Sequence, residues 1–156
     1  MDDAVIGWDR DQLMGIIRNC VMEINWLGVV FAFIAGMAVA FAWYQEGILG
    51  THWQRLVSNP PERSREARTR NMIQLLVANG LTAIGLAFGI GIAAAATGGS
   101  SVWMALLVGF AAWLTFSATT LLQHNAFELK PAKLTAINTG YQLALFLAMS
   151  LVIGLL

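Results

Sequence analysis

The sequence predicts an all-α polytopic membrane protein: an antiparallel bundle of four transmembrane helices, preceded by an amphipathic helix at the membrane surface. Of its 156 residues, 58% are hydrophobic and only 12% are charged, whereas a soluble domain has about 25% charged residues. Segments 24–45, 71–127 and 134–156 contain no Asp, Glu, Lys or Arg. A soluble fold of this size has too little interior to bury so much uncharged apolar chain.

The lengths of the apolar segments predict the number of spans. A helix that crosses the hydrocarbon core needs about 20 apolar residues at about 1.5 Å rise each. Four segments are long enough, namely 24–44, 72–96, 102–122 and 134–153. The sequence TGGSS at 97–101 separates the second segment from the third and suits a tight turn between antiparallel helices. We therefore expect one transmembrane domain, 24–156, with longer cytoplasmic connections at 45–71 and 123–133.

The first 23 residues form a separate outer-face segment, 1–23, in this interpretation. They hold five acidic residues against Arg10 and Arg18, unlike the basic start of a secretory signal peptide. The first apolar segment is therefore expected to remain as an anchor. Apolar residues recur at helical spacing in 11–24, which predicts an interfacial helix on the outer leaflet, with a partner-facing or frayed arm as the alternative. The single cysteine, Cys20, excludes an internal disulfide, and its role is open.

Basic residues predict the orientation, because Lys and Arg in short loops are retained on the cytoplasmic side. Seven of the nine Lys and Arg residues fall in the two longer connections: Arg55, Arg63, Arg65, Arg68, Arg70, Lys130 and Lys133. Both termini are therefore expected outside and both longer connections inside. Besides setting topology, six of these side chains are candidates for binding anionic lipid headgroups: Arg63, Arg65, Arg68, Arg70, Lys130 and Lys133.

Small residues recur at four-residue spacing in three of the spans. The stripes are Gly28, Ala32, Gly36 and Ala40; Gly85, Gly89 and Ala93; and Gly140, Ala144 and Ala148. Such stripes let helix backbones approach closely in a membrane. We expect them to pack the bundle, which leaves room for one of them to serve a second copy or another subunit.

The polar residues inside the spans are uncharged. The candidates for interhelical contacts or a polar cavity are Asn79, Trp113, Thr115, Asn138, Tyr141 and Gln142. No Asp, Glu, Lys, Arg or His lies within a span, which disfavours proton-coupled transport. We expect an amide contact between Asn79 and Asn138, and hydroxyls such as that of Thr115 bonded back to their own helix. A polar vestibule for a small solute is the alternative.

Four ionisable residues lie at the expected cytoplasmic boundary: Glu46, His52, His124 and Glu128. Two histidines and two carboxylates could hold a divalent metal. We favour the other interpretation, in which His124 and Asn125 cap the third helix and Pro131 delays the fourth. The sequence has no nucleophile motif, phosphate-binding glycine loop or cysteine cluster. We therefore predict no catalytic residue, metal or cofactor, and no nucleic-acid partner.

A set of aromatic, amide and glycine residues around the first and last spans carries a family resemblance. These are Asn25, Trp26, Trp43, Tyr44, Gly50, Trp53, Asn138, Gly140 and Tyr141. With them the chain resembles DUF1761, a family of small, mostly bacterial membrane proteins of unknown function. The resemblance implies a four-helix protein of the bacterial inner membrane and brings no activity or cofactor.

Three functions remain open at this point. We favour a non-enzymatic structural or accessory membrane protein, either a homo-oligomer or a subunit of a larger membrane complex. The second is a passive pore or carrier for a small solute, lined by Asn79, Thr115, Asn138 and Gln142. The third is an enzyme that modifies a lipid or isoprenoid with the cytoplasmic His and Glu residues.

Overall fold

The computed structural model describes residues 14–15, 24–45, 49–57 and 66–156. This part of the chain contains helices and no strand: α2 (Trp26–Trp43), α3 (Thr51–Val57), α5 (Arg68–Thr97), α6 (Val102–Ala112), the π-helix η2 (Trp113–Ala118), α7 (Thr119–Phe127) and α8 (Ala132–Leu155). α6, η2 and α7 join into one rod of 26 residues. The rod, α2, α5 and α8 are the four helices that are long and apolar enough to cross a membrane. The predicted all-α fold with four spans is confirmed.

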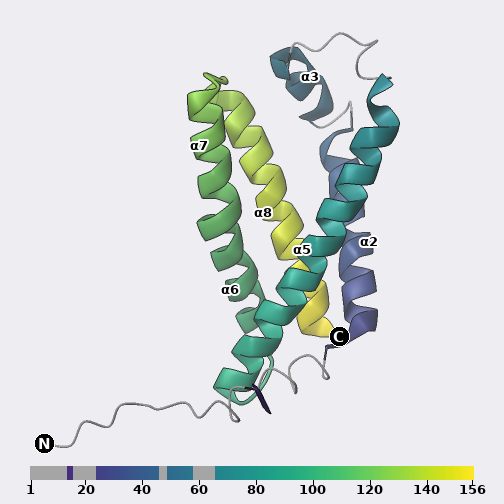
Figure 1. The fold of residues 1–156 in the computed structure, drawn as a ribbon, viewed down its shortest axis with the longest axis vertical. Coiled ribbons are helices and arrows are strands. Elements are labelled where there is room, and N and C mark those ends of the chain that lie inside the picture. The colour runs from purple at the N-terminus through teal and green to yellow at the C-terminus, as the bar shows by residue number, and fades with distance from the viewer. Residues whose placement is uncertain (1–13, 16–23, 46–48, 58–65) are drawn as a thin grey trace, which may run out of the picture.

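The four spans run up and down beside one another (Figure 1). α3, the α7–α8 connection and the start of α5 lie at one end of the bundle, which we call the cationic end. The α5–α6 turn and the C-terminus lie at the other. The cationic end carries the described cations Arg55, Arg68, Arg70, Lys130 and Lys133. α5 packs against α6 near their shared turn and diverges from α7 toward the cationic end.

Helix ends follow local capping chemistry. Asn25 caps α2, because its side-chain oxygen accepts from the backbone N–H of Gly28 at 3.1 Å. Ser101 caps α6 in the same way, accepting from Met104 N–H at 3.2 Å. Gly98 ends α5 in the left-handed region, with φ of 79°, which glycine adopts without steric cost. These caps place the predicted turn at 97–101 between α5 and α6 as expected.

The expected cap at His124 and Asn125 is wrong. α7 continues to Phe127, and Leu129 adopts the left-handed conformation, with φ of 53°. The backbone N–H of Lys130 then donates to the Asn125 carbonyl at 2.9 Å, which closes the end of the helix. Polar side chains such as those of His124 and Asn125 indicate where the apolar layer of the membrane ends. The helix itself continues until a residue leaves the helical backbone conformation.

The predicted outer-face segment, 1–23, lies outside the described residues apart from 14–15. Its interfacial helix and its boundary with the transmembrane domain therefore stay predictions.

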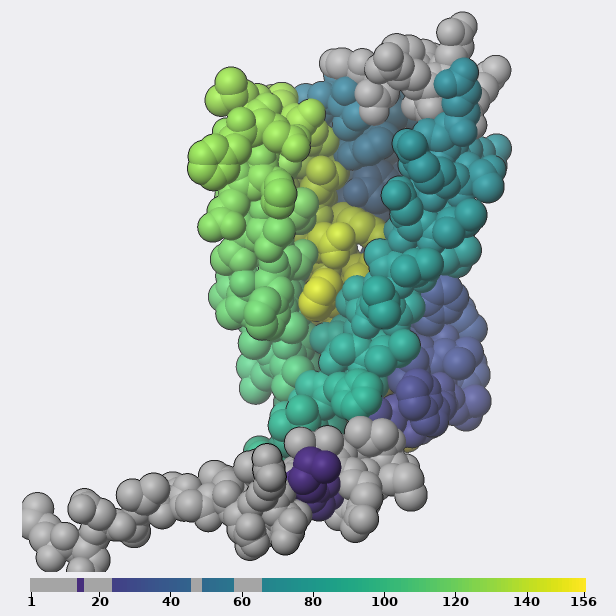
Figure 2. All heavy atoms as spheres, viewed as in Figure 1, coloured from purple at the N-terminus to yellow at the C-terminus, as the bar shows by residue number. Residues whose placement is uncertain are grey.

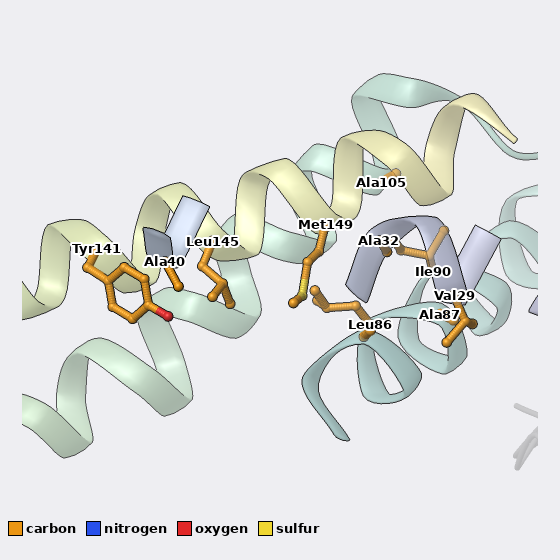
Figure 3. Packing of buried hydrophobic residues seen from close by; sticks show 11 residues of the cluster. Val29, Ala32, Ala40, Leu86, Ala87, Ile90, Ala105, Tyr141, Leu145 and Met149 are labelled. Carbon is orange, nitrogen blue, oxygen red and sulfur yellow. The ribbon is translucent and has the colours of Figure 1, made fainter. Parts of the chain in front are cut away.

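α8 is the centre of the bundle and packs against α2, α5 and α6. Tyr141, Leu145 and Met149 project from one side of α8 at intervals of four residues, as Figure 3 shows. All three are at least 95% buried. They meet the apolar faces of α2 and α5, where small residues such as Ala32 and Ala83 are fully buried. Close packing of small residues against large ones provides the dispersion contacts that hold helices together in lipid.

Two glycines of this core are required by close approach. A methyl group at Gly36 of α2 would collide with the side chain of Met149. A methyl group at Gly109 of α6 would collide with the side chain of Ser150 and would lie 3.2 Å from the Phe146 carbonyl oxygen. Both positions therefore set how closely α2 and α6 approach α8.

Candidate functional site

Aromatic and amide side chains from α2, α3 and α8 converge at the cationic end. We call Trp43, Tyr44, Trp53, Asn138 and Tyr141 the aromatic–amide cluster. At its centre, Oδ1 of Asn138 accepts hydrogen bonds from Trp53 Nε1 at 3.2 Å and from the Tyr44 hydroxyl at 3.5 Å. One amide of α8 therefore joins the end of α2 to α3.

The rings of the cluster pack around Tyr44. Its ring centroid lies 5.4 Å from that of Trp53, edge to face, and 5.1 Å from that of Tyr141. The rings of Trp43 and Tyr141 are 6.5 Å apart. Tilted aromatic pairs at these separations contribute about 0.5–1.5 kcal/mol each beyond the burial of their area. The rings and the Asn138 hydrogen bonds thus fix the short helix α3 on the bundle.

Gly50 allows the chain to turn back from α2 into α3. Its N–H donates to the Gln45 carbonyl at 3.0 Å. A methyl group at this position would collide with the Tyr44 carbonyl oxygen and lie 2.9 Å from that of Gln45. A glycine is therefore required for the approach that brings Trp53 to Asn138.

The cluster provides donors and aromatic surface but no acid or base near neutral pH. Burial, together with the nearby Tyr141, raises the pKa of the Tyr44 hydroxyl to about 12. Tyr44 consequently stays neutral and acts as a hydrogen-bond donor at physiological pH. Trp43 Nε1 and the Tyr141 hydroxyl are buried and have no hydrogen-bond partner among the described residues. The arrangement suits binding of an oxygen-bearing group or structural support better than proton transfer.

The expected contact between the amides of Asn79 and Asn138 is not formed in the described part of the chain. Asn79 donates to Met37 Sδ at 3.3 Å and lies beside the Tyr141 hydroxyl without good hydrogen-bond geometry. Asn138 is instead engaged by Trp53 and Tyr44. The sequence suggested that the two amides lie at similar depths in the membrane. Which groups meet is decided by how each helix is rotated about its axis and by the turn that brings α3 back against α8.

Trp113 and three threonines of the third span are hydrogen-bonded within the protein. Trp113 Nε1 donates to the Thr139 carbonyl at 3.1 Å and so connects η2 to α8. The Thr115 hydroxyl donates to the Ala111 carbonyl of its own helix at 2.7 Å, and those of Thr119 and Thr120 do the same one turn later. The expectation of back-bonded hydroxyls is confirmed for these threonines. Gln142 is half-buried on α8, one turn beyond Asn138.

The π-helical turn η2 was not expected from the sequence. A π-helix has hydrogen bonds that span one more residue than those of an α-helix, and it is often found at functional positions. The sequence feature that best indicates this π-helical turn is the run of Thr and Ser residues from 115 onward, because their hydroxyls compete with backbone N–H groups for helix carbonyls.

The candidate metal ligands are distributed over separate elements. His52 lies on α3, His124 on α7 and Glu128 just after α7, where its carboxylate is 3.8 Å from Lys130 Nζ. Glu46 lies outside the described residues. Within the described ranges, no three His, Cys, Asp or Glu side chains lie close enough together to hold a metal ion.

The cationic residues also divide between described and undescribed segments. Arg68 and Arg70 are exposed in the first turn of α5, and Lys133 is exposed in the first turn of α8. Lys130 lies in the α7–α8 connection, whereas Arg63 and Arg65 lie outside the described residues.

A second candidate site is a groove on the side of the bundle. It lies between α5 and the α6–η2 part of the rod, has a volume of about 560 Å³, and is also lined by Phe146 of α8. Its walls include Gly85, Gly89, Val108, Ala112, Thr115 and Phe116. In Figure 2 the surface is hollowed between α5 and the rod, and α8 is visible there. We call this the lateral groove.

Most of the residues that carry the family resemblance lie in or beside the aromatic–amide cluster, whereas Asn25 and Trp26 lie at the other end of α2. All five cluster residues belong to that set, and Gly50 is required by the turn that leads to it. Gly140 adjoins the cluster as well, since a methyl group there would lie 3.3 Å from the Trp43 ring. The sequence pointed to these aromatic residues through the family resemblance and predicted no contact among them, so their mutual contact was missed.

Comparison with known protein families gives a match over most of the chain. The family model described as "Protein of unknown function (DUF1761)" matches residues 27–154. Searches of curated proteins and of solved structures found no match.

Proposed function

This chain belongs to the DUF1761 family, whose function is unknown, and on that premise we propose that it is a non-enzymatic accessory protein of the bacterial inner membrane that assembles with a second copy of itself. The two copies meet at their lateral grooves. The observation that carries the proposal is a glycine stripe that packing inside the chain does not use.

The glycines of the lateral groove differ from those of the core. A methyl group at Gly85 would meet no atom within 4 Å, and one at Gly89 would meet Val108 at an ordinary contact distance of 3.4 Å. Glycine in a helix interior is disfavoured by about 1 kcal/mol relative to alanine. In a membrane, such a smooth stripe allows another helix to approach closely.

The groove favours an apolar occupant. The hydroxyls of Thr82 and Thr115, which line it, donate to carbonyls of their own helices at 2.9 and 2.7 Å. Their hydrogen-bonding capacity is therefore largely used, and the walls present methyl groups and glycine backbone. An aromatic or aliphatic side chain of a neighbouring helix fits this surface.

A second copy is the occupant that the geometry favours, because a protrusion and a hollow lie on the same face. Phe116, which borders the groove, is 74% exposed, and Leu81 on α5 is 65% exposed. A twofold contact brings the same patch of each copy together, so a hollow must face the partner's protrusion. Phe116 of one copy placed into the Gly85–Gly89 hollow of the other satisfies that condition.

We also propose the orientation expected from the sequence, with both termini outside and the cationic end in the cytoplasm. The described cations gather at the end where α3 and the α7–α8 connection lie (Figure 1). This gathering supports the orientation, because loops rich in Lys and Arg stay in the cytoplasm.

The two alternative functions have less support from the geometry. A pore was expected to use Asn79, Thr115, Asn138 and Gln142 together, but only Thr115 of these four lines the lateral groove. An enzyme was expected to use His52 and His124, which lie on α3 and α7.

The test measures self-association of the purified protein by sedimentation equilibrium in detergent micelles. We expect the wild type to be dimeric and Gly85→Leu to raise the dimer dissociation constant by about tenfold or more, since overpacking costs about 1–3 kcal/mol. Gly91→Leu is the matched control, because Gly91 lies on the same helix, its methyl group would also meet nothing, and it does not line the lateral groove.

Crosslinking in membranes provides an independent measurement. Phe116→Cys and Gly85→Cys, each in a Cys20→Ser background and mixed in one membrane, place one thiol at the protrusion and the other in the hollow, and oxidation should link the two variants only if these positions meet across the interface. A monomeric wild type, or equal loss of the dimer in Gly91→Leu, contradicts the proposal.

A further inference from the structure

A pocket at the cationic end brings three basic side chains together from two elements. His52 and Arg55 of α3 line it together with Lys133 of α8, and its volume is about 390 Å³. Its remaining lining is apolar: Leu49, Leu56, Ala136 and Ile137. We call it the basic pocket. It is separate from the lateral groove, with which it shares no lining residue.

The charge of the basic pocket favours an anion. No acidic side chain is among the described residues that line it. α8 begins at this pocket, has no acid in its first turn, and directs its unpaired N–H groups toward the same end. Arg offers a planar set of donors that matches phosphate oxygens, and Lys adds a compact positive charge.

The apolar walls of the pocket and its position at the membrane boundary favour a lipid over a free ion. Lys133 lies in the first turn of a spanning helix, so the pocket is at the boundary of the apolar layer. Leu56 and Ile137 provide apolar, half-buried walls beside the cations. Basic pockets beside spanning helices on the cytoplasmic side are typical binding places for anionic headgroups.

We propose that the basic pocket binds the phosphate group of an anionic phospholipid, with Arg55, Lys133 and His52 as its contacts. The apolar walls hold the first part of the acyl chains. In this proposal Arg55 and Lys133 bind a specific ligand in addition to setting the topology. Lipid binding at this pocket does not require self-association.

The aromatic–amide cluster holds the two sides of this pocket in place. Trp53 precedes Arg55 by two residues, Asn138 follows Lys133 by five, and the hydrogen bond between Trp53 and Asn138 joins α3 to α8. Trp53 and Asn138 are therefore positioning residues for the lipid site.

The experiment is a titration of the full-length protein in uncharged detergent with short-chain phosphatidylglycerol, with retained lipid counted by native mass spectrometry. Arg55→Gln/Lys133→Gln is compared with Arg68→Gln/Arg70→Gln. The second variant removes the same charge at the same end from exposed residues that do not line the pocket. We expect the dissociation constant to rise about tenfold to thirtyfold in the first variant and less than about twofold in the second.

Two further ligands identify the source of the phosphate. Phosphatidylcholine, which has the phosphate but no net charge, should bind at least about tenfold more weakly than phosphatidylglycerol, because the pocket is basic. Inorganic phosphate at millimolar concentration should displace little lipid if the acyl chains contribute. Strong competition by inorganic phosphate, equal affinity for the two lipids, or equal weakening in both double variants overturns the proposal.

Single variants keep the test decisive if the double variant does not fold. Arg55→Gln and Lys133→Gln should each weaken binding about fivefold, from the contribution of one cation near an anionic lipid. Trp53→Phe keeps both cations but removes the N–H that binds Asn138, and it should weaken binding by a smaller factor. Unchanged affinity in both single charge variants excludes the site.

Discussion

The face of α2 that packs on α8 and the face of α5 that lines the lateral groove both carry small residues at four-residue spacing, yet their geometry is opposite. At Gly36, as at Gly109 of α6, an added methyl group would collide with a side chain of α8, whereas at Gly85 it would meet nothing. The same sequence signature therefore serves closed packing in one region and an open surface in the other. Small-residue spacing alone does not distinguish an internal contact from a surface for a partner.

The largest effect should come from overfilling the closed region. Gly109→Val adds an isopropyl group whose Cβ alone would collide with Ser150 and lie 3.2 Å from the Phe146 carbonyl oxygen, and it should lower the free energy of unfolding by about 3 kcal/mol or prevent folding. Thermal unfolding in detergent, followed by circular dichroism, measures the change. Gly85→Val is the matched control, and both variants are compared at a dilution that keeps the protein monomeric. A similar melting temperature for both variants would show that the two regions do not differ in packing.

The next effect concerns the hydrogen bonds that hold α3. Asn138→Leu leaves the Trp53 indole N–H and the Tyr44 hydroxyl without their acceptor, at an expected cost of about 1–3 kcal/mol. Gln142→Leu, one turn along α8, is the control. Protease accessibility near α3 should increase together with the loss of stability. Unchanged melting and proteolysis would exclude Asn138 as the residue that anchors α3.

A milder pair of substitutions sharpens the contrast between the two glycine faces. Gly36→Ala requires the Met149 side chain to move and should destabilise the protein by about 1 kcal/mol. Gly85→Ala adds a better helix former in open space and should be neutral or stabilising by up to about 1 kcal/mol. Denaturant titration compares the free energies of unfolding of the two variants, at a dilution that keeps the protein monomeric. The reverse order of stability would contradict the assignment of the two faces.

The smallest effect is a pH dependence at the aromatic–amide cluster. The pKa of Tyr44 is raised from 10.0 to about 12 by burial, so between these values the folded state retains a proton that the unfolded state has lost. Stability is therefore unaffected by Tyr44 below pH 10 and decreases as the pH rises through this range. Tyr44→Phe should flatten that decrease relative to wild type. An identical alkaline profile for the two proteins would argue against a buried Tyr44 hydroxyl.

The sequence identified most residues of the candidate site, but it did not predict how they are arranged in space. Asn138 and Tyr141 were expected to contact other helices, and Trp43, Tyr44 and Trp53 were noted for the family resemblance. Their meeting depends on the turn at Gly50, which returns α3 to α8. The expected pairing of Asn138 with Asn79 failed because matching depth along two helices does not specify which faces are opposed.

The sequence by itself determined the fold class, the family and the four spans, because the hydrocarbon core admits only long apolar helices whose backbone groups are bonded internally. It also determined where several helices begin or end, since Asn25, Ser101 and Gly98 act through local hydrogen bonds and backbone conformation. Only the tertiary structure decided which glycine stripe is open and which cations line one pocket. Those properties depend on helix rotation and crossing, which follow from packing between side chains far apart in the chain.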